Sequence, residues 1–363
     1  MIENPFIEKI STDEKDEQLI DLALGGSKQA LEKLIYRHQA WIYNIALRMV
    51  FYPQEAEDIT QEVLIKIITK LSSFRKESAF RTWAYRIVVN QVLNMKKSLG
   101  EKKHSDNFVE YWKIIENVPD GELPSQENYK VEMNTLVNEV KVSCMSGMLL
   151  CLDREQRLVF ILGGIFQVTD KIGAEIMDTT RDNFRQKLSR ARKQLFNFMH
   201  NRCGLISRNN PCSCEKKTKA LIDSGYVNPD KLLFNVNYVH SVESTAEGRA
   251  ERFDELLDEN TNRIFRDSPF QEPPDFVISL REILDHKEFR EIAGMSCWKF
   301  LPAAGTMMRG WQWIGRKGLM NYCFAFRSAN WLAGSAVNAQ LANARKIIHA
   351  LWIIHSLVIL VNW

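Results

Sequence analysis

Apolar residues recur at helical spacing through most of residues 16–98. In the first long segment they follow steps of three and four residues along one face. The members of this stripe are Leu31, Leu34, Ile35, Ile42, Ile45, Ala46 and Met49. Residues 56–71 repeat the spacing after Pro53, which interrupts the pattern, and carry an acidic flank beside the apolar stripe. The pattern predicts about four amphipathic helices in this part of the chain.

A second helical block follows a polar stretch. Asp178, Thr179 and Thr180 form a polar turn in which a Thr can cap the next helix, predicted over 181–200. The other face of that helix is basic. Residues 181–202 contain a single acid, Asp182, and seven cations: Arg181, Arg185, Lys187, Arg190, Arg192, Lys193 and Arg202. A helix, a short turn and a basic helix are typical of a helix-turn-helix.

The predicted fold class is all-α, with two small helical domains joined by a linker and followed by a helical C-terminal extension. Residues 99–128 contain turn signals and only short apolar patches, which favours a linker. The predicted parts are 13–98 (first domain), 99–128 (linker), 129–202 (second domain), 203–236 (cysteine segment), 237–291 (helical extension) and 292–363 (tail).

The tail has a composition of its own. The chain as a whole has 48 Lys and Arg against 45 Asp and Glu, but residues 292–363 contain no acid, seven cations and six of the nine Trp. Its last 17 residues, 347–363, are uncharged and barely long enough to span a bilayer, with two His and an Asn among them. A membrane anchor and a fused or out-of-frame segment are the two interpretations, and the composition favours the second.

Cysteine usage and the first residues bear on the compartment. Seven scattered cysteines argue against a disulfide framework, and the acidic N-terminus lacks the pattern of a secretory signal. We therefore expect a cytoplasmic protein, with membrane partners not expected. Phosphate loops, metalloprotease helices and nucleophile elbows are missing from the sequence, so no catalysis is expected.

The basic helix offers groups that read DNA. Arg can bond guanine and Asn or Gln adenine, whereas Lys neutralises phosphate. The candidates for base contact are Thr180, Arg181, Asn183, Arg185 and Gln186, and those for phosphate are Lys187, Arg190 and Lys193. An ordinary solvated basic face is the alternative.

Residues 72–91 interleave aromatic and basic side chains. Phe74, Phe80, Trp83 and Tyr85 alternate with Arg75, Lys76, Arg81 and Arg86. Such interleaving suits single-stranded DNA, because bases stack on aromatic faces while cations hold the backbone. The alternative places Phe80 and Trp83 in the core between helices. Arg86 and Asn90, four residues apart on one helix face, are harder to assign to a core.

Three stretches together resemble a known family. They are AEDITQEVLIKI (56–67), SAFRTWAYRIVVN (78–90) and a helix-turn-helix from LDREQRLVF (152–160) to LSRARKQL (188–195). In this order and separation they resemble the extracytoplasmic-function sigma factors of bacterial RNA polymerase, over roughly residues 16–200. The residues at the helix-turn-helix turn are less usual for the family, which leaves the promoter sequence undetermined.

The resemblance implies partners and roles. Core RNA polymerase would bind the acidic flank Asp58, Gln61 and Glu62, and promoter DNA would bind two surfaces. The minus-thirty-five element would be read by the helix matching 180–192, with Lys193 beside it. The minus-ten element would be opened and read by the segment matching 72–90, with a flipped base held by the loop matching 75–80, through Phe74, Arg75, Phe80, Arg81, Trp83, Tyr85, Arg86 and Asn90. An anti-sigma factor is a further partner that the family allows and the sequence does not identify.

Beyond His200 the chain continues past the point where minimal members of that family stop. His200, Cys203, Cys212 and Cys214 have a spacing and ligand number that zinc accepts, although a CxC pair is a poorer chelate than CxxC. Redox-responsive thiols and plain structural cysteines are the alternatives, and no other cofactor is expected.

Two other functions compete with the sigma factor. One is a stand-alone helix-turn-helix regulator that acts without polymerase, and the other is a metal- or redox-sensing regulator centred on the cysteines. A simple repressor needs neither the acidic docking helix nor the aromatic segment, so these two features favour the sigma factor.

Overall fold

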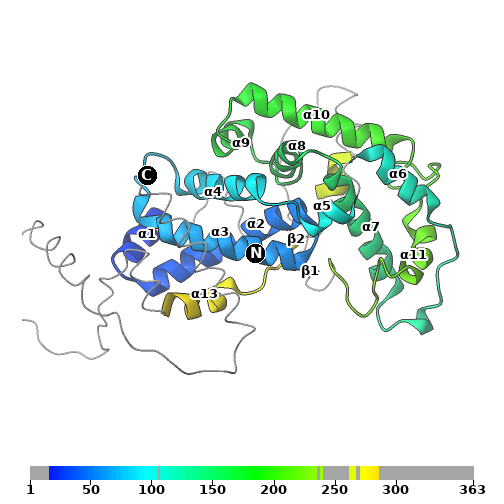
Figure 1. Ribbon diagram of the computed structural model, residues 1–363, viewed down its shortest axis with the longest axis horizontal. Coiled ribbons are helices and arrows are strands. Elements are labelled where there is room, and N and C mark those ends of the chain that lie inside the picture. Colours follow the sequence, from blue (N-terminus) through cyan, green and yellow to red (C-terminus); the bar gives the residue numbers. More distant parts are fainter. Residues whose placement is uncertain (1–15, 105–106, 235–237, 240–260, 267–269, 286–363) are drawn as a thin grey trace, which may run out of the picture. The chain divides into compact units, whose positions relative to one another are not determined.

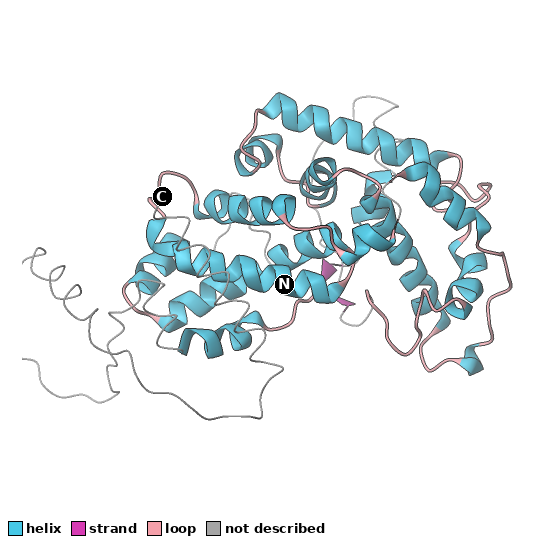
Figure 2. Cartoon of the chain, in the orientation of Figure 1, coloured by secondary structure: helices cyan, strands magenta, loops and turns pink. Residues whose placement is uncertain are grey.

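The computed structural model describes residues 16–104, 107–234, 238–239, 261–266 and 270–285. Helices make up nearly all the regular structure of these residues (Figure 2), which confirms the all-α class. None of the described helices is long and apolar enough to cross a membrane. The tail, with its apolar stretch 347–363, lies outside the described residues.

The first helical group is built around one long buried helix (Figure 1). Its elements are α1 (Asp16–Leu24), α2 (Lys28–Val50), α3 (Pro53–Lys70), a 3-10 turn (Leu71–Ser73) and α4 (Phe80–Asn94). The α2 helix packs against α1, α3 and α4, and Trp41, Ile42 and Ile45 lie fully buried in it. Pro53 begins α3 at its first turn, where a missing N–H costs nothing, so it marks a helix start.

The segment 99–128 is more structured than the polar linker predicted for it. It forms α5 (Leu99–Lys103), α6 (Phe108–Asn117) and a 3-10 turn (Gln126–Asn128). Local caps start the two helices, since Ser98 and Asn107 accept hydrogen bonds from the backbone N–H groups three residues on. The apolar patches are the reason for α6, because Phe108 and Tyr111 pack their rings against Phe198.

The second helical group contains the predicted helix-turn-helix. Its elements are α7 (Met133–Leu150), α8 (Arg154–Val159), a π-helical turn (Phe160–Ile165), α9 (Asp170–Ile176) and α10 (Arg181–His200). The bounds of α10 confirm the predicted helix 181–200. Phe184 fills the space between α9 and α10 so tightly that a side chain at Gly173 would meet its ring at 2.4 Å. The short approach of the two helices therefore requires glycine there.

The extension beyond residue 202 adds smaller elements. They are α11 (Cys214–Asp223), a short helix over 261–266, α13 (Phe276–Asp285) and two short antiparallel strands, β1 (Tyr238–Val239) and β2 (Phe270–Gln271). Both strands lie within residues 237–291, which were predicted to be a helical extension, so this part of the chain is not helical throughout. Helix α11 packs on α7, and α13 packs on α2 and α3.

The two helical groups are in contact with each other. Helix α2 contacts α7 and α8, and α4 contacts α8 and α9. By these contacts all described residues belong to one compact unit. The domain boundaries given above stay predictions.

Candidate nucleic-acid interface

The start of α10 is fixed by a local cap. The Thr180 hydroxyl accepts a hydrogen bond from the Asn183 backbone N–H at 3.2 Å, as predicted for this turn. The Asn183 side chain in turn donates to the Thr179 hydroxyl at 2.7 Å. Six of the eight predicted DNA-contacting side chains here are exposed: Thr180, Arg181, Arg185, Gln186, Arg190 and Lys193. Asn183 and Lys187 are half-buried.

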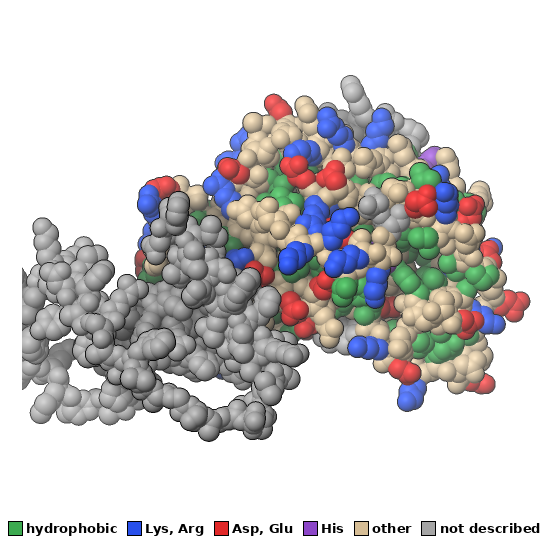
Figure 3. Space-filling view, in the orientation of Figure 1, with side chains coloured by type: hydrophobic (Ala, Val, Ile, Leu, Met, Phe, Trp, Pro, Cys, Tyr) green, Lys and Arg blue, Asp and Glu red, His purple; other side chains and the backbone are tan. Residues whose placement is uncertain are grey.

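Two of the cations on α10 are occupied within the chain. Arg185 forms an ion pair with Asp170 of α9 and lies 3.5 Å from Asp182. Lys187 pairs with Glu155 of α8. Figure 3 shows such mixing more widely, with acidic side chains among the Lys and Arg that gather near the middle of the view. A DNA phosphate would have to displace a carboxylate at each of these two cations.

The aromatic residues of the minus-ten segment form a small core. The Phe74 and Phe80 rings meet edge to face at 5.7 Å, and Phe80 also contacts His38 at 5.4 Å. Phe74, Phe80 and Tyr85 are 8%, 3% and 0% exposed, while Trp83 is half-buried. Of the two rings that the core interpretation named, Phe80 is buried and Trp83 is only half-buried, and Phe74 and Tyr85, which it did not name, are buried as well. Bases cannot stack on ring faces that other side chains already cover.

The basic residues of the same segment are mostly on the surface. Residues 75–79 form an exposed loop whose two ends are anchored by the buried Phe74 and Phe80. Lys76 adopts a left-handed backbone conformation (φ 58°) and pairs with Asp21 of α1 at 2.6 Å. Arg86 and Asn90 are both exposed on α4, as their spacing suggested, and Arg81 is half-buried.

The acidic flank predicted to bind polymerase lies on α3. Asp58 is exposed, and Gln61 and Glu62 are half-buried. The Glu62 carboxylate accepts hydrogen bonds from Lys66 at 2.9 Å and from Gln91 of α4 at 2.7 Å. Glu62 therefore also ties α3 to α4, whereas Asp58 faces solvent.

The two predicted DNA surfaces meet at Arg86. Its Nε donates to the Glu175 carbonyl oxygen of α9 at 2.9 Å, and its guanidinium lies 3.6 Å from the Asp178 carboxylate. A groove at this point is lined from one side by Arg86 and from the other by Lys171, Arg181 and Asn183. Residues predicted to read different promoter elements therefore share one groove.

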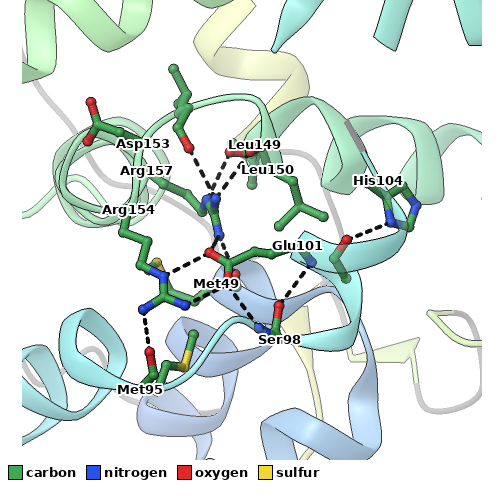
Figure 4. Close-up of polar contacts among 12 residues, drawn as sticks. Met49, Met95, Ser98, Glu101, His104, Leu149, Leu150, Asp153, Arg154 and Arg157 are labelled. Carbon is green, nitrogen blue, oxygen red and sulfur yellow. Dashed lines mark hydrogen bonds and ion pairs between the residues drawn. The ribbon is translucent and has the colours of Figure 1, made fainter. Parts of the chain in front are cut away.

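A charged cluster joins the two helical groups (Figure 4). Glu101 on α5 accepts two hydrogen bonds from Arg154, at 2.9 and 2.7 Å, and one from Arg157 at 3.2 Å. Arg157 also donates to the carbonyl oxygen of Met49 on α2 at 2.6 Å and to three carbonyls around the α7–α8 turn: Leu149, Leu150 and Leu152. Arg154 reaches the carbonyls at the end of α4.

The charges in this cluster are held strongly. Burial opposes ionisation of Glu101, but hydrogen bonds from Arg154 and the Ser98 backbone, with the charge of Arg157, lower its pKa to about 2. Arg157 is 2% exposed, and burial lowers its pKa against the opposing effect of Glu101. Gly100 sets the position, because a side chain there would lie 2.2 Å from the Val50 carbonyl oxygen.

Sequence reasoning missed Glu101, Arg154 and Arg157 as an interacting set. One local signal was available, since Ser98 and Glu101 have the spacing of a capping box and form one in the structure. The capping box predicts the start of α5. It gives no indication that the same carboxylate binds two arginines more than 50 residues away.

The cysteine segment does not assemble the predicted four-ligand zinc site. Cys203 and Cys212 form a β-bridge, in which the Cys212 N–H donates to the Arg202 carbonyl oxygen and the Gly204 N–H donates to the Cys212 carbonyl oxygen. His200 is exposed, and its ring lies beside that of Phe196, with centroids 4.8 Å apart. Among the described residues, no group of three or more potential ligands is placed to hold a metal ion. Burial raises the pKa of Cys203 to about 11 and that of Cys214 to about 12.

Comparisons with known proteins agree with the helical arrangement. The model of the sigma-70 region 2 family matches residues 34–101. The chain is 31% identical over 132 residues to the RNA polymerase sigma-H factor of Pseudomonas aeruginosa, covering 35% of this chain and 68% of that protein. It is 26% identical over 186 residues to the ECF RNA polymerase sigma-E factor of Haemophilus influenzae, covering 50% and 94%.

Another sigma-E factor and one solved structure were also matched. The ECF RNA polymerase sigma-E factor of Escherichia coli K12 is 27% identical over 183 residues, covering 50% of this chain and 93% of that protein. A solved structure of CnrH in complex with the cytosolic domain of CnrY aligns with a TM-score of 0.36 and 18% identity, covering 51% of this chain and 97% of that chain. The matched region 2 ends at Glu101, at the junction of the two helical groups. The chain belongs to the sigma-70 family of RNA polymerase sigma factors, in its extracytoplasmic-function group.

Proposed function

We propose that this sigma factor divides initiation among three surfaces of the chain. It binds core RNA polymerase, recognises promoter DNA and promotes strand opening. The acidic flank of α3 docks polymerase, the loop 75–79 with the exposed face of α4 reads the minus-ten element, and the first turns of α10 read the minus-thirty-five element. Polymerase supplies the catalytic step, and the complex acts in the cytoplasm, where the chromosome is.

One observation carries this assignment: a region 2 match and, after it, a capped basic helix-turn-helix occur in the same chain. A stand-alone repressor needs only the second. The exposed loop between two buried aromatics supports minus-ten recognition, because it offers cations on a fixed frame while leaving room for an unpaired base. The metal-sensing alternative has no assembled site in the described residues.

The decisive experiment is transcription in vitro with core polymerase on a library of genomic promoter fragments. We expect initiation from a small set of fragments, with unpaired thymines near the minus-ten element becoming reactive to permanganate. Binding to the same fragments without core polymerase, and no initiation with it, would favour the stand-alone regulator.

Docking is tested by reversing charge at Asp58, the exposed member of the acidic flank. Asp58→Lys replaces attraction by repulsion toward a basic partner, and we expect it to abolish co-purification with core polymerase. Lys113→Glu on α6 is the matched control, since it also reverses an exposed charge, far from α3 in the sequence. Unchanged co-purification of Asp58→Lys would remove the docking assignment.

A further inference from the structure

We propose that the described chain is a closed form of the sigma factor that cannot read both promoter elements, held shut by its own C-terminal extension and by the Glu101 cluster. This rests on the proposed function, because it concerns the two surfaces that would read promoter DNA. Opening of the two helical groups then becomes a required and controllable step before promoter binding.

Geometry gives the first argument. The minus-ten and minus-thirty-five elements are about 25 base pairs apart by name, which is about 85 Å of duplex at 3.4 Å per base pair. Arg86 and Glu175 are in direct hydrogen-bond contact at 2.9 Å, and Thr180 begins the recognition helix five residues after Glu175. Duplex DNA is too stiff to fold back over so short a length. The two surfaces therefore cannot occupy their elements while this contact exists.

The contact also places Arg86 beside residues that a DNA-binding form would present to the bases. The first turns of a recognition helix enter the major groove and contact base edges. Here Arg181 and Asn183 line a groove whose opposite wall is Arg86. In the closed form, Arg86 and α4 therefore stand where the DNA would approach these residues.

The Glu101 cluster is the first of two sets of contacts that hold the helical groups together. It joins α5, at the end of the matched region 2, to α8 of the helix-turn-helix group through Arg154 and Arg157. Bidentate arginine pairs and hydrogen bonds to charged groups are stronger than neutral ones. The Arg154 side chain is 22% exposed, so it can exchange its contact with Glu101 for water when the two groups separate. The Arg157 side chain is buried.

The second set of contacts is made by the extension clasp, defined as residues 261–266 and 270–285. Phe270 packs against both Trp41 of α2 and Phe166 of the helix-turn-helix group, with ring centroids at 5.1 and 6.2 Å, and these two rings also contact each other at 4.9 Å. The buried Asn44 side chain donates to the Gln271 carbonyl at 2.7 Å and accepts from its N–H at 2.9 Å, as a paired strand would.

The clasp reaches the other group as well. Arg266 donates to the Gly164 carbonyl oxygen at 2.9 Å, and Phe265 packs against Phe160 at 5.3 Å. On the first group, Arg281 of α13 bonds both carboxylate oxygens of Glu32, at 2.6 and 2.7 Å. One short part of the extension therefore binds both groups at once, which is the arrangement that holds them together.

The test compares the full-length wild type with the double variant Arg154→Ala, Phe270→Ala. The variant weakens the contacts of the Glu101 cluster and of the extension clasp and leaves the predicted DNA-contacting residues unchanged. Small-angle scattering of the free protein reports opening, and titration with a promoter duplex obtained from the transcription assay reports access. If about a tenth of the wild type is open, full opening tightens duplex binding about tenfold. We expect that gain together with a larger radius of gyration. Lys113→Ala, an exposed cation on α6, is the control and should change neither quantity.

A second variant guards against misfolding. If the double variant loses helix content, Arg266→Ala decides, because it removes a hydrogen bond to the other group and should tighten duplex binding several-fold. An unchanged radius and unchanged duplex affinity in the folded variants would overturn closure, even with normal initiation on core polymerase. Failure of every variant and of the wild type to initiate with core polymerase would instead overturn the proposed function.

Discussion

The segment predicted to read the minus-ten element and α10, the recognition helix predicted for the minus-thirty-five element, both present cations, but they are built in opposite ways. The minus-ten segment is a loop, residues 75–79, that two buried aromatics hold at its ends. The recognition helix is a regular helix with a Thr180 cap, and its cations emerge from one face. At the loop, the buried aromatic residues hold the ends in place and the neighbouring cations are exposed. In the helix, the apolar stripe and the basic face both follow from the same helical spacing of residues.

This contrast shows how alternating aromatic and basic residues can be interpreted. Where aromatics and cations alternate, the aromatics can be the anchors that determine where the cations lie, as Phe74 and Phe80 are. Where cations follow a helical stripe, they need no such anchors. The two surfaces should therefore respond differently to substitution, and the following experiments test that.

The largest effect is expected at Phe80, which is 3% exposed among Phe74, Trp83 and His38. Phe80→Ala should destabilise the first helical group by about 3 to 5 kcal/mol, because it removes a buried ring and leaves a cavity. Urea unfolding measures the loss. Arg75→Ala, an exposed neighbour in the loop, should stay within about 0.5 kcal/mol. A loss below about 1 kcal/mol in the free energy of unfolding for Phe80→Ala would show that this ring is not part of the core and is free to stack on a base.

Features fixed by short stretches of sequence were predictable. The bounds of α10 follow from a 3.6-residue stripe that begins after a capping Thr, and both signals lie within about 20 residues of each other. The exposure of Arg86 and Asn90 followed from their spacing of four residues. In both cases the helix itself contains all the information needed.

Features that depend on distant residues were not predictable. Whether Phe74 and Tyr85 are buried depends on what covers them, and alternation alone leaves that open. The pairing of Asn44 with Gln271 joins residues 227 positions apart. His200 and Cys203 have the spacing of metal ligands on one helix face, but α10 ends at His200 and turns follow it. Spacing in the sequence fixes a shared helix face only while the helix continues.

The second effect distinguishes base contacts from phosphate contacts on the recognition helix. Arg185→Ala and Gln186→Ala should each cost about 1 to 3 kcal/mol on the preferred promoter and little on other sequences. Lys193→Ala should weaken binding about equally on all sequences, and Lys187→Ala should do so less, since Glu155 already occupies that cation. Competition titrations with preferred and scrambled duplexes give both numbers. A uniform loss for all four variants would mean that the reading face lies elsewhere on α10.

The third effect is a pH dependence of the cluster that joins the two groups. The pKa of Glu101 is about 2 in the folded chain, against an ordinary 4.5, so its ionised form stabilises the fold. That contribution is complete above pH 4.5 and is lost as the pH falls toward 2. We expect about 2 kcal/mol, allowing for solvent screening at the partly exposed Arg154.

The measurement compares the free energy of unfolding of the wild type and Glu101→Gln at pH 7, 5 and 3. Glutamine keeps an oxygen for the Ser98 backbone N–H but carries no charge for the arginines. The two proteins should differ by nearly the full amount at pH 7 and 5 and by clearly less at pH 3, and they should converge only as the pH approaches 2. Parallel curves over the whole range would show that the carboxylate charge contributes nothing to the junction.

The smallest effect concerns the loop itself, at Lys76. This residue makes an exposed ion pair with Asp21 and holds a left-handed backbone conformation, φ 58°. Lys76→Ala removes the ion pair and keeps the backbone strain, so it should cost between about 0.2 and 1 kcal/mol, and less at high salt. Lys76→Gly also removes the ion pair but relieves a conformation that glycine adopts freely, so it should be more stable than Lys76→Ala by about 1 kcal/mol. Thermal unfolding of the two variants at low and high salt separates the contributions. If Lys76→Gly were the less stable of the two, the loop would not hold its shape through the buried aromatics at its ends, and the contrast with the self-supporting recognition helix would fail.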